Sequence, residues 1–270
     1  MQIRFWGTRG SIPVSGPEYV EFGGNTPCLE IRLRRSTELL ILDSGTGIRA
    51  LGQALMADPT APRRLHLVLT HAHWDHIQGF PFFAPAYVPG FEIDIYCTKD
   101  AHRFLEGQMS PPYFPVDLTV MGAKLQFHQL EARGERTIAG ARIRWIPLPH
   151  PQGSTGIRVE EDGRSFVFAT DTEHPEAGLN QDLVTLARDA EALVYDAQYT
   201  PAEYAAGKRG WGHSTWHDGA MLARASGVKK LVLFSHDPLH DDDECRRIET
   251  ETRRIFPEVW SARQNGVLDL

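Results

Sequence analysis

The sequence predicts an α/β (α+β) fold, a four-layer αββα sandwich in which two β-rich halves pack face to face and helices cover the outer faces. Short apolar runs typical of strands come before helix-like segments in the first half of the chain, and this order returns in the second half. No linker or shift in composition separates the two halves. We therefore expect residues 1–270 to form a single domain.

The first half begins with strands and continues into helices. Ile48, Leu51 and Leu55 fall at i, i+3 and i+7, which predicts an amphipathic helix that packs on a sheet. The proline-broken stretch 79–85 excludes a long helix there, and a second helix is expected over 99–107. Apolar or alternating runs predict strands at 2–6, 28–34, 39–43, 65–69 and 91–97.

The second half follows the same order. An Asp162-Gly163 turn joins two apolar runs and predicts a hairpin. The last helix is expected to begin at the acidic run 241–244, which suits the positive end of a helix dipole. Strands are predicted at 124–129, 136–139, 141–148, 155–160, 165–170, 192–196 and 230–235, and further helices at 180–188 and 215–226.

The composition excludes several classes of protein. The chain is 41% hydrophobic and 23% charged and has no low-complexity tract, as expected of a globular protein. No apolar run approaches the ~18 residues that span a bilayer, and the N-terminal residues lack the apolar core of a signal peptide. Three widely spaced cysteines indicate reduced thiols. We expect a cytoplasmic protein that does not contact membranes.

The segment Thr70-His71-Ala72-His73-Trp74-Asp75-His76 is the densest group of metal-ligand side chains in the chain. It follows the apolar run 65–69, so a buried strand is expected to deliver it as a loop. Histidine is the commonest metal ligand, and carboxylates bind the same cations. In extended backbone His71 and His73 point the same way and can converge on one ion. A helix that follows would direct Asp75 and His76 to a neighbouring ion.

Further donors occur where later apolar runs end. His150 follows the run 142–148, Asp171 follows 165–170, and His236 follows 230–235. Side chains at strand ends collect at one edge of layered α/β folds, so these three are expected to complete a site for two metals.

This ordered pattern resembles the metallo-β-lactamase superfamily, whose motif His-x-His-x-Asp-His is followed by one His, one Asp and one His. The resemblance covers the chain from Phe5 to His236 and implies the αββα sandwich. It also implies that His71, His73 and His150 hold one metal, that Asp75, His76 and His236 hold the other, and that Asp171 bridges them. His and Asp ligands suit zinc; manganese and iron are alternatives.

Gly212-His213-Ser214-Thr215 resembles the His-Ser-Thr loop of the phosphodiesterase branch, whose best-known member is ribonuclease Z. The resemblance implies that His213 donates a proton to the leaving oxygen, that Ser214 and Thr215 hold the phosphate, and that Asp75 steers the attacking water. Imidazolium and hydroxyl groups stabilise the charge of a phosphoryl transition state. On local grounds alone, the segment is also a turn followed by a helix cap.

Two further positions have more than one interpretation. Asp43 ends a strand, and the resemblance implies that it supports a metal ligand, although a helix cap is an equal alternative. The proline-rich stretch 109–115 resembles the segment that lines the substrate cleft of related hydrolases, which makes Tyr113 a candidate substrate contact. An ordinary surface connection explains that stretch equally well.

The substrate is constrained by charge and by departures from the family pattern. The net charge of −7 argues against a large nucleic acid as partner. Tyr195-Asp196-Ala197-Gln198 stands where ribonuclease Z carries His-Glu-Ala-Thr, and its tRNA-binding arm has no obvious counterpart. We expect a small-molecule phosphodiester such as a cyclic nucleotide. Alternatives are ester, lactone or amide hydrolysis, tRNA 3′ processing, and a metal-binding regulatory module without turnover; a homodimer remains open.

Overall fold

Two seven-stranded sheets form the centre of the computed structural model, which describes all residues 1–270. The first sheet has the order β14-β1-β2-β3-β4-β5-β6. Its strands are β1 (Gln2–Gly7), β2 (Cys28–Arg32), β3 (Leu39–Leu42), β4 (Arg64–Val68), β5 (Glu92–Cys97), β6 (Lys124–Gln129) and β14 (Val267–Asp269). The second sheet has the order β13-β12-β11-β10-β9-β8-β7. Its strands are β7 (Gly134–Ile138), β8 (Ala141–Leu148), β9 (Ser154–Glu161), β10 (Arg164–Ala169), β11 (Ala192–Asp196), β12 (Lys230–Phe234) and β13 (Val259–Ser261).

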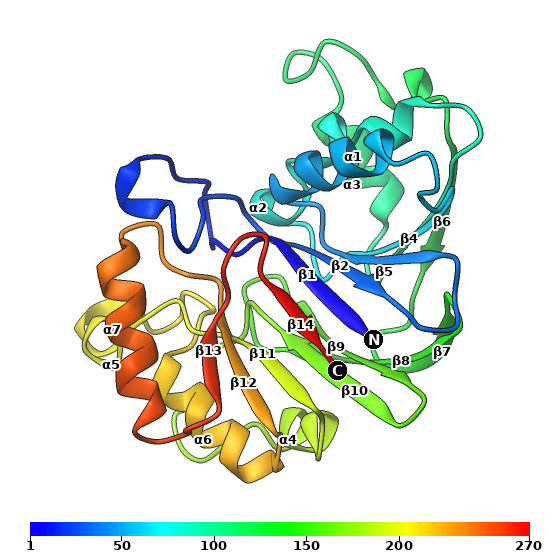
Figure 1. Ribbon diagram of the computed structural model, residues 1–270. Coiled ribbons are helices and arrows are strands. Elements are labelled where there is room, and N and C mark those ends of the chain that lie inside the picture. The colour runs from blue at the N-terminus through cyan, green and yellow to red at the C-terminus, as the bar shows by residue number, and fades with distance from the viewer.

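Helices cover the outer face of each sheet, which confirms the predicted four-layer sandwich (Figure 1). Against the first sheet lie α1 (Gly47–Ala57), α2 (Trp74–Ile77) and α3 (Ala101–Gln108). Against the second lie α4 (Gln181–Ala187), α6 (Trp216–Ser226) and α7 (Asp242–Arg253), with the short α5 (Pro201–Glu203) nearby. Short 3₁₀ or π turns complete the chain: η1 (Pro17–Tyr19), η2 (Phe80–Phe82), η3 (Ala84–Tyr87), η4 (Leu118–Val120) and η5 (Tyr204–Lys208).

Three apolar cores separate these layers. One lies between the sheets and includes Phe5, Trp145 and Phe166. The other two lie beneath the helices, as the stripe of Ile48 and Leu51 predicts for α1. No helix in the structure combines the length and the hydropathy that a membrane crossing requires.

Parallel pairing brings the site residues to one edge of each sheet. Strands β3, β4, β5 and β6 run parallel, and so do β10, β11, β12 and β13. The carboxyl ends of parallel strands lie at the same edge, so the loops that follow them meet. Asp43 follows β3, His71 follows β4, Asp171 follows β10 and Asp196 ends β11.

Two short strands near the C-terminus were not predicted from the sequence. β13 joins the second sheet, whereas β14 returns to the first and pairs antiparallel with β1. The N- and C-terminal residues consequently lie side by side, and the Met1 ammonium donates a hydrogen bond to the Leu270 carbonyl at 3.1 Å (Figure 1). Strands of three residues carry too little alternation to be recognised from a sequence.

Candidate metal centre

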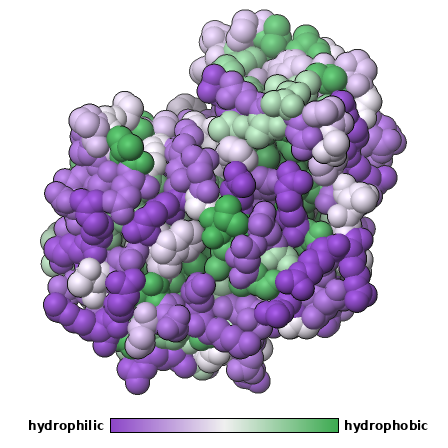
Figure 2. Space-filling view, viewed as in Figure 1, coloured by the Kyte–Doolittle hydropathy of each residue, from purple (hydrophilic) through white to green (hydrophobic).

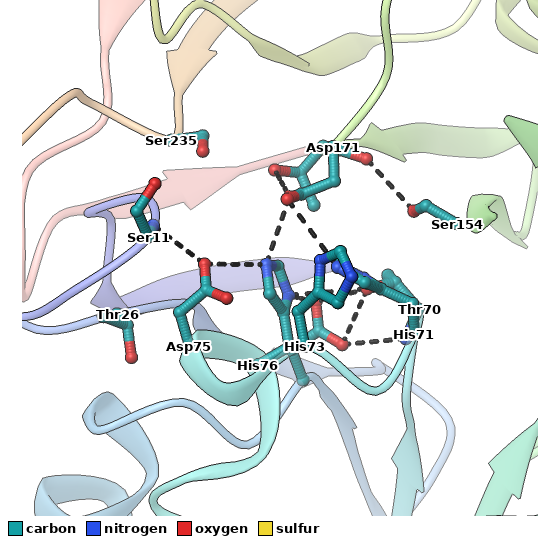
Figure 3. Close-up of polar contacts among 12 residues, drawn as sticks. Ser11, Thr26, Thr70, His71, His73, Asp75, His76, Ser154, Asp171 and Ser235 are labelled. Atoms are coloured by element: carbon teal, nitrogen blue, oxygen red, sulfur yellow. Dashed lines mark hydrogen bonds and ion pairs between the residues drawn. The ribbon is translucent and has the colours of Figure 1, made fainter. Parts of the chain in front are cut away.

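Six of the seven metal-ligand candidates converge at the strand ends. Figure 3 shows Asp171, from the end of β10, facing His71, His73 and His76 across the cleft. The six are His71, His73, Asp75, His76, His150 and Asp171. Their polar atoms approach closely: Asp171 Oδ2 lies 3.1 Å from His76 Nε2, and Asp171 Oδ1 lies 3.7 Å from His150 Nε2. His73 Nδ1 and His150 Nε2 are 3.0 Å apart.

Within this cluster three overlapping groups have the spacing of metal ligands, their donor atoms lying within 4.8 Å of one another. They are His71 with His73 and His150, His71 with His76 and Asp171, and His150 with Asp171 and His213. Asp171 belongs to two of the groups, as the expected bridging position requires. Asp75 lies beside the second group, with Oδ2 at 3.3 Å from His76 Nε2.

His213 belongs to one of these groups, whereas His236, the seventh expected ligand, belongs to none. His213 Nε2 lies 3.9 Å from Asp171 Oδ1, and its ring is 5.2 Å from that of His150. His236 is buried against the edge of Phe22, and its Nε2–H donates to the Ala262 carbonyl at 2.9 Å. This hydrogen bond places a proton on Nε2 and leaves Nδ1 as the lone-pair nitrogen of the neutral His236 ring.

Three other histidines donate hydrogen bonds to the protein through Nδ1 instead of Nε2. His76 and His213 each donate Nδ1–H to a carboxylate at 2.8 Å, respectively Asp43 and Asp196. His150 donates Nδ1–H to the Gly212 carbonyl at 2.7 Å. Such partners fix the tautomer, so that Nε2 faces the cluster as a lone-pair donor.

Asp43 therefore acts as a support for His76, one of its two sequence interpretations. The helix α1 has Thr46 as its N-cap residue, and Asp43 instead accepts hydrogen bonds from the Thr70 backbone N–H and hydroxyl at 2.8 and 3.0 Å. Asp196 was not predicted as a support. Its signal was the same as that of Asp43 and Asp171, a carboxylate at the end of an apolar run.

Burial and charge determine the protonation states in the cluster. Burial lowers the pKa of His71 well below its usual value. Burial also opposes a charge on His76, but Asp171, Asp75 and Asp43 together raise its pKa well above the usual value. At His213, burial is outweighed by Asp196 and Asp171, which raise the pKa to about 9. Binding of a cation would displace the protons that these imidazoles hold.

The donor atoms of this cluster are better placed to bind a cation than to hydrogen-bond to one another. His71 Nε2 and His76 Nε2 are buried and make no hydrogen bond of good geometry, although Asp171 oxygens lie 3.8 and 3.1 Å from them. A buried polar nitrogen without a partner costs about 1–3 kcal/mol, and two of them point into the same group as the Asp171 carboxylate. Imidazole and carboxylate donors at this spacing suit a divalent transition metal.

Ser214 and Thr215 lie differently from the expectation that they hold a phosphate. Ser214 is fully buried, and its hydroxyl lies 2.9 Å from His174 Nδ1 and 3.0 Å from the Tyr195 hydroxyl. Thr215 is the N-cap residue of α6 and accepts from the Asp218 backbone N–H. Both side chains therefore have partners within the protein, and Thr215 occupies the helix-cap position that was the alternative interpretation.

One cation at the edge of the site has no acidic partner. Lys208 Nζ lies over the rings of Tyr199 and Trp211, 5.4 and 4.1 Å from their centroids, and forms no ion pair. The Tyr199 ring is in turn 5.9 Å from that of His213. Lys208 follows no strand and belongs to no motif, so no pattern in the sequence indicates a role for it.

One family model and several known proteins match most of this chain. A family model described as "Beta-lactamase superfamily domain" matches residues 39–236. A ribonuclease BN of Cronobacter sakazakii is 25% identical over 307 residues, covering 95% of this chain and 96% of its own length. A ribonuclease Z of Synechococcus is 26% identical over 322 residues, covering 97% and 96%.

Solved structures of similar fold cover nearly the whole chain. The metallo-β-lactamase fold protein YhfI of Bacillus subtilis has a TM-score of 0.76 at 16% identity, covering 99% of this chain and 98% of its own. The short form of human tRNase Z has 0.71 at 20%, covering 100% and 99%. A diphosphatase of the PhnP family has 0.72 at 19%, covering 100% and 97%. At these identities the likeness establishes the fold.

Proposed function

We propose that this chain, which belongs to the metallo-β-lactamase superfamily and to its ribonuclease Z-like branch, is a phosphodiesterase that acts on a small phosphodiester such as a cyclic nucleotide. Members of the superfamily are metal-dependent hydrolases, and this chain is one of them. The bond that it cleaves, the site residues and the substrate are our proposal. The observation that carries it is the buried His and Asp cluster with two imidazole nitrogens that make no hydrogen bond of good geometry.

We assign the ligands from the groups described above. His71, His73 and His150 would hold one cation, Asp75 and His76 would hold the other, and Asp171 would contact both. His213, which groups with His150 and Asp171, would be the remaining donor. Divalent cations in these positions lower the pKa of water and withdraw charge from a phosphoryl oxygen. The donor set suits zinc, with manganese and iron as alternatives.

The chain's own groups would orient the reactants. Asp75 is fixed by the Ser11 backbone N–H, which donates to Oδ2 at 2.9 Å, so its carboxylate can accept a proton from a water in the cleft. Asp196 keeps the His213 ring in one orientation. In this assignment His213 binds metal, which replaces the expectation that it protonates the leaving oxygen.

A phosphodiester is favoured over a neutral ester or lactone by the unpaired cation at the rim. Lys208 lacks a carboxylate partner and is held over Tyr199 by a cation–π contact, so its charge remains available to an anion. A phosphate group carries a charge that a lactone lacks. The acidic net charge of −7 argues against a long polyanion.

tRNA processing is a second candidate, favoured by one specific observation. Curated relatives named ribonuclease Z or BN align over almost the full length of the chain. Their names concern RNA, and a similar site on this chain would accept an RNA end if the cleft admits it.

A turnover panel tests the proposal. Zinc-loaded protein should hydrolyse bis(p-nitrophenyl) phosphate and nucleoside cyclic phosphates, and it should lose that activity when a chelator removes the metal. Lactone opening without any phosphodiester cleavage would refute it. Processing of a tRNA precursor without turnover of small diesters would establish the second candidate instead. An Asp171→Ala variant is the control for contaminating phosphodiesterases, because it removes the carboxylate shared by the two cations.

A further inference from the structure

A cavity of about 620 Å³ lies beside the proposed metal centre, between α2 and the segment that follows α3. Ala72 and Trp74 in its wall are sequence neighbours of His71, His73 and Asp75, so the cavity lies close to the proposed ligands. Its volume is in the range of small-molecule pockets, ~300–1,000 Å³. A group in this cavity could belong to a substrate whose reacting atoms lie at the metal centre.

Aromatic side chains line this cavity and remain open to solvent. Trp74 is 79% exposed, Phe82 58% and Tyr113 80%, three of the most exposed aromatic residues of the chain. Phe82 packs edge-on against Phe114, their ring centroids 5.7 Å apart. Apolar residues also gather over the upper part of the surface in Figure 2, around α1, α3 and the following segment. Exposed aromatic clusters of this kind mark binding sites more often than ordinary surface.

The polar groups of the wall are uncharged. No Asp, Glu, Lys or Arg lines the cavity, and its polar side chains include Gln78 and Gln108. Each glutamine donates its Nε2–H to the protein: Gln78 to Thr26 Oγ1 at 3.2 Å and Gln108 to the Ile77 carbonyl at 3.1 Å. Neither Oε1 atom has a hydrogen-bond partner in the structure. Both carbonyl oxygens can therefore accept a hydrogen bond from a ligand.

We propose that this cavity binds the nucleobase of the substrate, which makes the substrate class a nucleotide phosphodiester. The inference rests on the proposed function, because the phosphate of the same molecule would lie at the metal centre. A nucleobase is flat, neutral and rich in N–H donors, which matches the aromatic walls and the two free carboxamide oxygens. An aliphatic chain would match the apolar walls and leave both oxygens unsatisfied.

Binding of two matched ligands to the zinc-loaded protein tests the inference without turnover. Adenosine 5′-monophosphate and ribose 5-phosphate share the sugar and the phosphate and differ in the base. Calorimetry should give a dissociation constant about tenfold or more lower for the adenosine compound, as expected for one stacked base. Trp74→Ala and Tyr113→Ala should each reduce this preference, and Trp74→Phe should retain most of it. Met221→Ala, which removes an exposed apolar side chain from α6, is the matched control.

Each outcome decides the inference. Equal affinity for the two ligands, or a preference that survives both alanine variants, would overturn it. A Trp74→Leu variant with the same preference for the adenosine compound as Trp74→Phe would also overturn it. Apolar area, and not an aromatic ring that stacks on the base, would then explain the preference. A failure of the proposed function is distinguishable, since it would appear as absent phosphodiester turnover with the base preference intact. Because Trp74 and Tyr113 are largely exposed, the variants should fold, and Tyr113 is distant in sequence from the ligands.

Discussion

Asp43→Asn should weaken metal binding although Asp43 would touch no metal. Asp43 is fully buried and accepts the His76 Nδ1–H at 2.8 Å. An asparagine keeps the shape and can still accept from the Thr70 N–H, but its NH₂ group would then face His76 Nδ1. His76 would have to move its proton to Nε2, the nitrogen that faces Asp75 and Asp171.

The expected magnitude follows from the bond that is lost. A hydrogen bond to a charged group contributes about 1.5–3 kcal/mol, and changes of such supporting partners typically lower metal affinity by about 10–100-fold. Zinc affinity should be measured by competition with a chromophoric chelator, starting from metal-free protein. The same range is expected for Asp196→Asn, because Asp196 accepts from His213 with the same 2.8 Å geometry.

Asp94→Asn provides the matched control. Asp94 is also buried and accepts from a histidine, His128 Nε2, at 2.7 Å, but it lies outside the metal cluster. This variant should change thermal stability and leave zinc affinity within about twofold. If Asp43→Asn binds zinc as tightly as the wild type, or if Asp94→Asn loses as much affinity, the supporting role of Asp43 is refuted.

Three other outcomes are expected. His213→Ala should bind one zinc ion fewer per chain than the wild type by elemental analysis, whereas His236→Gln should bind the same amount; the reverse pattern would restore His236 as a ligand. Burial and Arg9 lower the pKa of His236 to about 3, below the ~6.5 of the unfolded chain. The neutral ring therefore favours the fold above pH ~6.5, and stability should fall as the pH drops from there towards 3, by up to ~1.4 kcal/mol per pH unit. Urea unfolding of metal-free protein should show a weaker pH dependence for His236→Gln, and identical slopes would contradict a buried neutral ring. Lys208→Gln should raise KM for phosphodiesters while kcat stays similar, and an equal rise for a neutral lactone would argue against recognition of charge.

The His and Asp side chains that follow strands could be predicted because two independent sequence signals occur together at these positions. An apolar run indicates a buried strand, and a His or Asp directly after it indicates a side chain at the sheet edge. This rule selects His71, His150 and Asp171, which the structure brings into one cluster. It also selected His236, since β12 ends just before it, and the rule contains no information on the direction of the side chain.

The position of His213 depends on contacts that no local pattern encodes. It lies in the segment between η5 and α6, without a preceding strand, and Asp196 at the end of β11 orients its ring. His236 is turned away by a partner from another element, the Ala262 carbonyl that follows β13. Because β13 was not predicted, the hydrogen bond that occupies His236 Nε2 could not be foreseen.

The return of β14 to the first sheet has a consequence for synthesis of the chain on the ribosome. β14 pairs with β1 through Gln2↔Asp269, Ile3↔Leu268 and Arg4↔Val267, so this edge of the first sheet stays open until residues 267–269 have emerged. We propose that the two halves form one domain for this reason. Pairing between the two ends closes a very long loop and is expected to be slow. Until then the free edge of β1 is exposed to wrong strand partners. A nascent chain stalled before residue 267 should therefore depend on chaperones more than a chain that includes β14.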